Sequence, residues 1–225
     1  MERRKELLDL GVGILVFGSL WGLLEATLGG WLHALNLPYK GAIMANLGFT
    51  IMAAAVAVYK RPTLPVGIGL VAASFKLLDV LIFSLSPLAR TVVNPAMAII
   101  LEAMAFQAAV SLLWRPYQQR GLARAGAGML GMYLAYIGIA LVFFYLLRRG
   151  PRDVTDPLGL VGFAIQDGTI AALAALVAAP LGHRLGELIR ARKEQLALHN
   201  PRLLYRGALA LAAACWLGVA LSLLL

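Results

Sequence analysis

A chain of 225 residues with 61% hydrophobic and only 14% charged residues is too apolar for a soluble domain of this size. Its net charge of +9 comes from Lys and Arg in short segments between apolar runs, an arrangement that excludes the continuous basic face of a nucleic-acid-binding protein. The mean hydropathy of +0.81 predicts an integral membrane protein whose main partner is the lipid bilayer.

Apolar runs follow one another along the whole chain. Each is about as long as a helix needs to cross a hydrocarbon core roughly 30 Å thick, and none shows the period-two alternation of barrel strands. We therefore predict an all-α, polytopic transmembrane helical bundle of six to seven helices, forming a single membrane domain over residues 1–225. The predicted spans are 10–30, 42–59, 66–85, 94–114, 126–147, 159–181 and 207–225.

The distribution of positive charge predicts how the bundle sits in the membrane. The first apolar run is too long for a signal peptide, so we expect it to be retained as a helix. Fourteen Lys and Arg residues fall on the side of the N-terminus and five on the other side. Because positive loop charge stays in the cytoplasm, we predict a cytoplasmic N-terminus in the cell (plasma or inner) membrane, with the C-terminus outside.

One connection, residues 183–206, is longer than the others. Its apolar residues, among them Leu185, Leu188 and Ile189, fall near one helical face. We predict a cytoplasmic amphipathic connection, which either lies on the membrane surface or docks a cytoplasmic partner.

Four acids lie inside predicted spans, where a charged side chain is costly and by default marks a functional site. They are Glu25, Asp79, Glu102 and Asp167, and Lys76 lies one turn from Asp79. With the predicted orientation and a rise of 1.5 Å per residue, all five fall roughly 7 to 14 Å below the outer surface. The sequence thus predicts one charged layer in the outer half of the bundle.

Small residues share the helix faces of these acids. In the first span Gly18, Gly22 and Glu25 follow one another at spacings of four and three, and the other three spans show similar stripes. The acids are therefore expected to face into the bundle. Fully ionised, the layer suits a cation, either a proton, a metal ion or an organic ammonium. The alternative is structural: Lys76 and Asp79 neutralise each other, and the remaining acids are protonated or hydrogen-bonded.

Further polar candidates lie near the same depth. Asn46 is close to the outer end of the second span, Asn94 opens the fourth, and His33 belongs to a predicted loop, 31–41, that is placed to cover the pocket. A single histidine does not support a metal site. The sequence contains no HExxH, GxSxG, Walker or dinucleotide motif, so we predict neither a catalytic residue nor a cofactor.

The bundle resembles the substrate-binding subunit of energy-coupling factor vitamin transporters. The resemblance rests on its Ala and Gly content, on Asn94-Pro95 opening the fourth span, and on Gly18 and Gly22, which match small residues that in the family meet a coupling subunit. It covers at most the first 181 residues, and the seventh span departs from the family's usual six helices. The resemblance implies an outward-facing solute pocket, a coupling membrane subunit and a separate ATPase.

The sequence thus predicts a membrane transport protein that binds a small cationic solute, and the resemblance implies that it acts as the substrate-binding subunit of a multi-subunit transporter. An alternative is a stand-alone proton- or ion-coupled carrier, and another is a non-catalytic subunit whose buried charges serve assembly. Gly18 and Gly22 are predicted as helix-packing or partner contacts. The predicted substrate-binding residues are Glu25, Asp79, Glu102, Asp167, Lys76, Asn46, His33 and Asn94.

Overall fold

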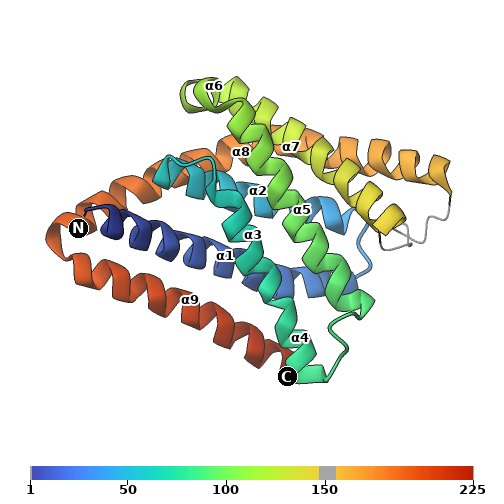
Figure 1. Cartoon of the computed structure of the whole chain (residues 1–225), viewed down its shortest axis with the longest axis horizontal. Helices are drawn as coiled ribbons and strands as arrows, with labels where there is room; N and C mark the ends of the chain where they lie inside the picture. The colour runs from blue at the N-terminus through green and yellow to red at the C-terminus, as the bar shows by residue number, and fades with distance from the viewer. Residues whose placement is uncertain (1, 147–155, 225) are drawn as a thin grey trace.

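A computed structural model describes residues 2–146 and 156–224, and all regular structure within these ranges is helical (Figure 1). Seven of its helical segments are long and apolar enough to cross a membrane. The prediction of an all-α transmembrane bundle is therefore confirmed. The elements are α1 (Glu2–Ala34), α2 (Lys40–Tyr59), α3 (Leu64–Ser74), α4 (Lys76–Phe83), α5 (Arg90–Leu112), α6 (Trp114–Gln119), α7 (Gly121–Leu141), η1 (Val142–Leu146), α8 (Pro157–His199) and α9 (Pro201–Leu224).

The first helix is longer than its apolar run. Residues 31–34 continue α1, and α2 begins at Lys40, so the predicted loop 31–41 is reduced to residues 35–39. The chain reverses there with positive φ angles at Asn36 and Tyr39, 49° and 56°. Asparagine tolerates this left-handed conformation better than most residues because its short polar side chain can bond locally.

The third span is divided into two helices. α3 and α4 meet at Phe75, where the Phe75 amide donates to the carbonyl of Ala72, three residues back, at 3.2 Å. Such a bond tightens the turn, so α4 starts as a new helix. α4 has no buried residue and carries both Lys76 and Asp79, which places these two charges where the third span emerges from the core.

The fifth span ends in the π-helical segment η1, and position 147, the predicted end of that span, lies outside the described residues, as does the last predicted position, 225. The next described element, α8, begins with the side chain of Asp156 accepting a hydrogen bond from the Gly159 amide at 2.8 Å. This is an N-cap, in which a side-chain oxygen satisfies a free amide of the first helical turn.

The predicted connection 183–206 is not a separate element in the structure. Residues 183–199 continue α8, and α9 starts at Pro201, directly after a short break at Asn200. The physical reason lies in Gly182 and Gly186. A Cβ atom on either would come within 2.4 Å of a backbone carbonyl oxygen of α2, those of Thr50 and Ala54 respectively. This close packing holds the first part of the segment against the bundle.

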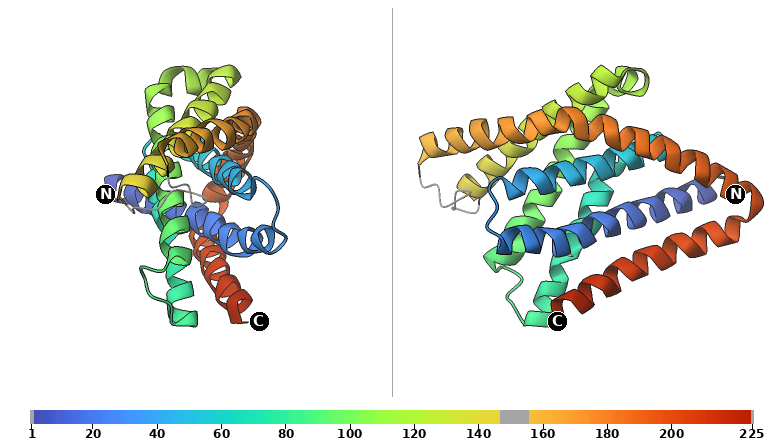
Figure 2. Two further views of the ribbon diagram at one scale, coloured as in Figure 1. Left: turned by 90° about the vertical axis from the view of Figure 1, so that its right-hand side faces the viewer. Right: turned by 180° about the vertical axis from the view of Figure 1, so that it is seen from behind.

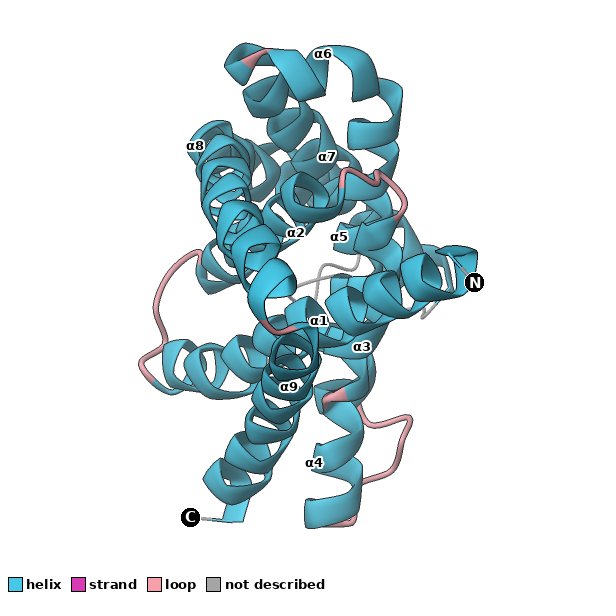
Figure 3. Ribbon diagram, turned by 90° about the vertical axis from the view of Figure 1, so that its left-hand side faces the viewer, coloured by secondary structure: helices cyan, strands magenta, loops and turns pink. Residues whose placement is uncertain are grey.

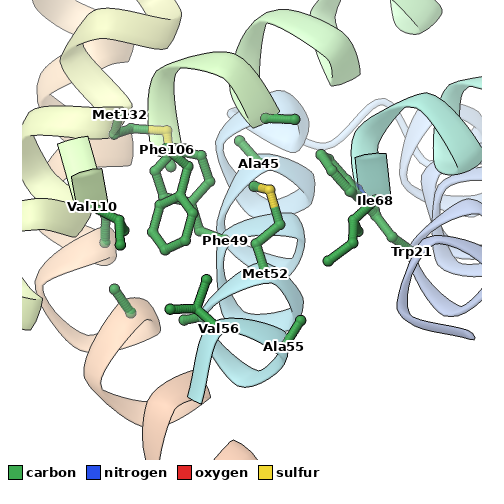
Figure 4. Packing of buried hydrophobic residues seen from close by; sticks show 14 of the residues in the cluster. Trp21, Ala45, Phe49, Met52, Ala55, Val56, Ile68, Phe106, Val110 and Met132 are labelled. Atoms are coloured by element: carbon green, nitrogen blue, oxygen red, sulfur yellow. The ribbon is translucent and has the colours of Figure 1, made fainter. Parts of the chain in front are cut away.

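Helix α2 is at the centre of the molecule and packs against α8, α5 and α1. The largest core side chains meet around it (Figure 4), where the rings of Phe49 and Phe106 lie 4.7 Å apart and Trp21 is fully buried. α9 lies beside α1 at the edge of the bundle (Figures 1 and 2). Viewed along the bundle, α8 and α9 meet at the end where α1 begins (Figure 3). The opposite end of α1 therefore faces the α4–α5 connection.

Candidate functional site

The polar cavity of the bundle lies at the C-terminal end of α1, opposite the N-terminus. Its volume is about 460 Å³, within the size range of small-molecule sites, about 300–1,000 Å³. The starts of α2 and α5 and the short helix α4 complete its wall. We call it the Glu25 pocket; it is lined by Glu25, Ala26, Gly29, Gly30, Lys40, Gly41, Met44, Lys76, Asp79, Thr91 and Pro95.

Helix α4 contributes an ion pair to this pocket. The Lys76 ammonium donates to Asp79 Oδ2 at 3.2 Å, one helical turn along α4. The two side chains are 17% and 15% exposed, so water reaches them only in part. Since the pair is formed within one short helix, its geometry does not depend on the packing of other helices. The pairing predicted from the sequence is present, and it leaves each partner with atoms that face the pocket.

Glu25 has a different environment. Its Oε1 lies 3.7 Å from the point where a side chain on Gly29 would begin, next to the Met44 side chain. The Glu25 carboxylate thus lies beside Gly29 and Met44, both of which line the cavity. Lys76 interacts electrostatically with Glu25, yet among the side chains that the structure describes none forms a hydrogen bond or an ion pair with it. Glu25 is therefore an acceptor that faces the cavity and has no described protein partner.

Glu102 lies next to the Glu25 pocket without lining it. Its side chain is buried in α5, only 9% exposed, and it interacts electrostatically with Glu25. Glu102 and Glu25 are therefore two carboxyl groups close enough to influence each other. Within the predicted layer, Glu102 interacts with Glu25, Glu25 with Lys76, and Lys76 with Asp79.

Asp167 lies elsewhere and does not line the Glu25 pocket. It is buried in α8, where the neighbouring Gly168 packs against the side chain of Tyr136 of α7; a Cβ on that glycine would lie 3.3 Å from Tyr136 Cβ. Asp167 therefore lies next to the α7–α8 interface, and it has an interaction partner. The equal depth predicted from the sequence does not bring it to the Glu25 pocket, because the α8 helix packs mainly against α2 and α7.

The three remaining polar candidates are also placed apart from the cavity wall. Asn46 donates its side-chain amide to the carbonyls of Ala42, at 2.8 Å, and Ala171, at 3.1 Å, which links α2 to α8. Asn94 is half-buried in the first turns of α5 but does not line the cavity, although Thr91 and Pro95 do. The backbone of His33 is part of α1, and its side chain lies outside the described part of the structure.

Lys40 and Thr91 line the Glu25 pocket but are not among the predicted site residues. The sequence places Lys40 only within the predicted loop 31–41. In the structure it is the first residue of α2 and lies beside the cavity. The charged residues of the wall are therefore two acids and two lysines, with Glu102 close behind them. This is a more balanced set than the four acids and one lysine of the predicted layer. No group of three or more His, Cys, Asp or Glu suited to a metal ion occurs among the described residues.

Gly18 and Gly22 are packing residues within this chain. A Cβ on Gly18 would lie 2.5 Å from Val71 Cβ, and one on Gly22 would lie 2.4 Å from the Phe75 ring. Both glycines are buried beneath α3. Helix packing, one of the two roles predicted for them, is thus found; partner contact, the other role, stays a prediction.

The molecule is a multi-pass membrane protein by the length and composition of its helices. Its polar cavity combines one unpaired carboxylate with a lysine–aspartate pair. No family model matches the chain, and neither a curated protein nor a solved structure matches it.

Proposed function

We propose that this membrane protein binds a small solute through a positively charged group, which pairs with Glu25 inside the Glu25 pocket. The observation that carries the proposal is the Glu25 carboxylate, which faces a cavity of about 460 Å³ and has no described protein partner. A buried or half-buried charge without a partner is costly, and a cationic ligand supplies the missing partner.

The other charges in the wall restrict which solutes fit. The Lys76 ammonium is engaged by Asp79, so it competes little with the ligand for Glu25. Lys40 leaves a positive charge at the cavity wall, and an anionic group on the solute can lie near it. The charged residues of the pocket favour a compact ammonium compound over a multiply charged cation, because two lysines line the same cavity.

A role in transport follows as part of the same proposal. Under the sequence-based orientation, the Glu25 pocket opens to the outside, so the protein captures its solute there. The resemblance to the substrate-binding subunit of energy-coupling factor transporters implies a coupling subunit and an ATPase.

The test is thermal unfolding of the detergent-purified protein with choline, ethanolamine, putrescine and arginine, each added separately. A bound ligand at 100 times its dissociation constant stabilises the folded state by about 2.7 kcal/mol, so at least one of these probes should raise the melting temperature of the wild type. Glu25→Gln should abolish the rise while leaving the protein monodisperse. Glu194→Gln, an exposed acid paired with Arg190, is the matched control and should keep it.

The same preparations give an independent readout. Small molecules extracted from the wild type and from Glu25→Gln are compared by mass spectrometry, and an ammonium compound should be present only in the wild type. Identical extracts together with no probe-induced stabilisation would show that the cavity does not bind a cationic solute. Unfolding of Glu25→Gln without added probe would assign Glu25 a structural role.

A further inference from the structure

A second cavity lies at the opposite end of the bundle, between α1 and α9. It has a volume of about 330 Å³. The end of α2 and the part of α8 around Ile189 and Lys193 complete its wall. We call it the α1–α9 groove. Its lining is almost entirely apolar and comprises Val12, Val16, Phe17, Leu20, Val58, Ile189, Leu204, Ala208 and Leu211, with Asp9, Tyr59, Lys193 and Tyr205 at one end.

The polar groups at that end interact with one another. Lys193 donates to Asp9 Oδ2 at 2.6 Å, and its ammonium lies 4.0 Å from the centroid of the Tyr59 ring. Their hydrogen-bonding and charge requirements are therefore met without a ligand, which leaves the interior of the groove apolar. An apolar cavity open to a bilayer fills more favourably with hydrocarbon than with water.

Positive charge remains at this end of the bundle after the acids have been paired. Each of the acids Glu6, Asp9, Glu187 and Glu194 forms an ion pair with a different base: Arg61, Lys193, Lys60 and Arg190, respectively. Lys5 and Arg202 are exposed and form no ion pair with any acid whose side chain the structure describes. The local field is thus positive and attracts an anion.

Lys5 and Arg202 are also on the helix faces that form the groove. Lys5 lies four residues before Asp9, and Val12 and Val16 continue the same face of α1 at spacings of three and four. Arg202 lies three residues before Tyr205 on α9. Both cations therefore stand one helical turn beyond the polar end of the groove, where long side chains reach a headgroup.

We propose that the α1–α9 groove binds one acyl chain of an anionic phospholipid, with the lipid phosphate held between Lys5 and Arg202. The apolar lining accounts for the chain and the two unpaired cations account for the charged headgroup. The exposed cations at the polar end favour a lipid over a transmembrane helix of a partner, because an apolar helix offers no anionic group to Lys5 and Arg202. In the orientation predicted from the sequence, the site faces the anionic cytoplasmic leaflet.

The experiment is native mass spectrometry of the delipidated full-length protein, titrated in separate samples with phosphatidylglycerol and phosphatidylcholine of identical acyl chains. The wild type should bind one phosphatidylglycerol more tightly than phosphatidylcholine. Lys5→Gln/Arg202→Gln should lower phosphatidylglycerol affinity by about fivefold per charge removed, as about 1 kcal/mol for each basic residue implies. It should lower phosphatidylcholine affinity less, because the choline cation of that lipid offsets the charge of the same phosphate.

A variant that fills the groove tests the contribution of the acyl chain to binding separately from that of the headgroup. Ala208→Phe places a ring in the groove and should reduce binding of both lipids at least tenfold. Ala210→Phe, on an exposed face of α9, and Arg120→Gln, an exposed cation beside α6, are the matched controls and should bind as the wild type does.

Two results would overturn the proposal. One is equal affinity of the wild type for both lipids; the other is phosphatidylglycerol binding that Ala208→Phe leaves intact. If Ala208→Phe fails to fold, the charge variant decides alone, because Lys5 and Arg202 are exposed and their replacement does not disturb the core. An unchanged preference for phosphatidylglycerol in Lys5→Gln/Arg202→Gln then excludes the site.

Discussion

Lys76 and Asp79 are the residues whose relation was easiest to predict, because residues three apart on a helix are always neighbours. Small residues on the helix faces of Glu25 and Glu102 predict that both acids face into the bundle. In the structure Glu25 lines the same pocket as the pair, and Glu102 interacts with Glu25. Asp167 has the same depth and a similar stripe, yet it lies next to the α7–α8 interface. Depth and facing direction are local properties of one helix, whereas the order of helices around α2 is decided by packing that a single sequence does not reveal. The sequence does not predict Lys40 as a pocket residue, because a residue at the start of a helix gives no periodic signal of the direction in which it faces.

The ion pair of α4 should show measurable coupling. Lys76→Gln and Asp79→Asn each leave one charged partner unpaired, so the double variant should be less destabilised than the sum of the single variants, by about 1 kcal/mol. Partial exposure keeps this value between those of surface and buried pairs. Denaturant titrations of the four proteins in one detergent complete the cycle. Strictly additive effects would mean that the two charges do not stabilise each other.

The apolar runs predict the position and approximate length of the helices. They do not predict where the helices end. The α3–α4 division at Phe75 has no proline or glycine at the break, only Ser74 and Lys76 on either side, so no helix-ending residue predicts it. The part of α8 beyond residue 181 is predicted as an amphipathic connection, because the apolar run ends there and the apolar residues that follow fall near one helical face. Gly182 and Gly186, which hold that segment against α2, gave a usable signal, since two glycines four apart permit backbones to approach closely.

The contact between α2 and α8 should therefore be sensitive to a single methyl group. In Gly186→Ala the new Cβ would lie 2.3 Å from the Ala54 carbonyl oxygen, so the helices must separate, at a cost of about 1–3 kcal/mol. Gly207→Ala is the matched control: no atom lies within 4 Å of its added Cβ, and helix propensity alone should stabilise it by up to about 1 kcal/mol. Thermal unfolding of both variants measures the difference. Equal melting temperatures would contradict the close approach of the two helices.

At the scale of the molecule, the Glu25 pocket and the α1–α9 groove lie at opposite ends of the bundle, and the charge bias of the loops predicts which end faces the cytoplasm. The α4–α5 connection belongs to the pocket end, and α6 lies toward the other end (Figure 1). The orientation in the membrane decides which compartment supplies the solute.

Cysteine labelling tests this orientation. Cys215 is the one cysteine of the sequence and is buried, so Cys215→Ala provides a background without thiols. In that background, a membrane-impermeant maleimide applied to intact cells should label Ser86→Cys, in the α4–α5 connection, and spare Gln119→Cys, at the end of α6. Both positions are exposed, so both should react after the membrane is permeabilised. The reverse pattern would place the Glu25 pocket on the cytoplasmic side.

The contact between Phe75 and Trp216 has a thermodynamic consequence. Their ring centroids lie 4.0 Å apart, so α9 touches the residue directly before Lys76, while five to twelve residues earlier it forms the wall of the α1–α9 groove. One helix therefore lines the groove and packs against α4, which carries Lys76 and Asp79. If occupancy of the groove shifts α9 and changes solute affinity by some factor, linkage requires the solute to change lipid affinity by the same factor. The affinity of the protein for its solute then depends on the lipid composition of the surrounding bilayer.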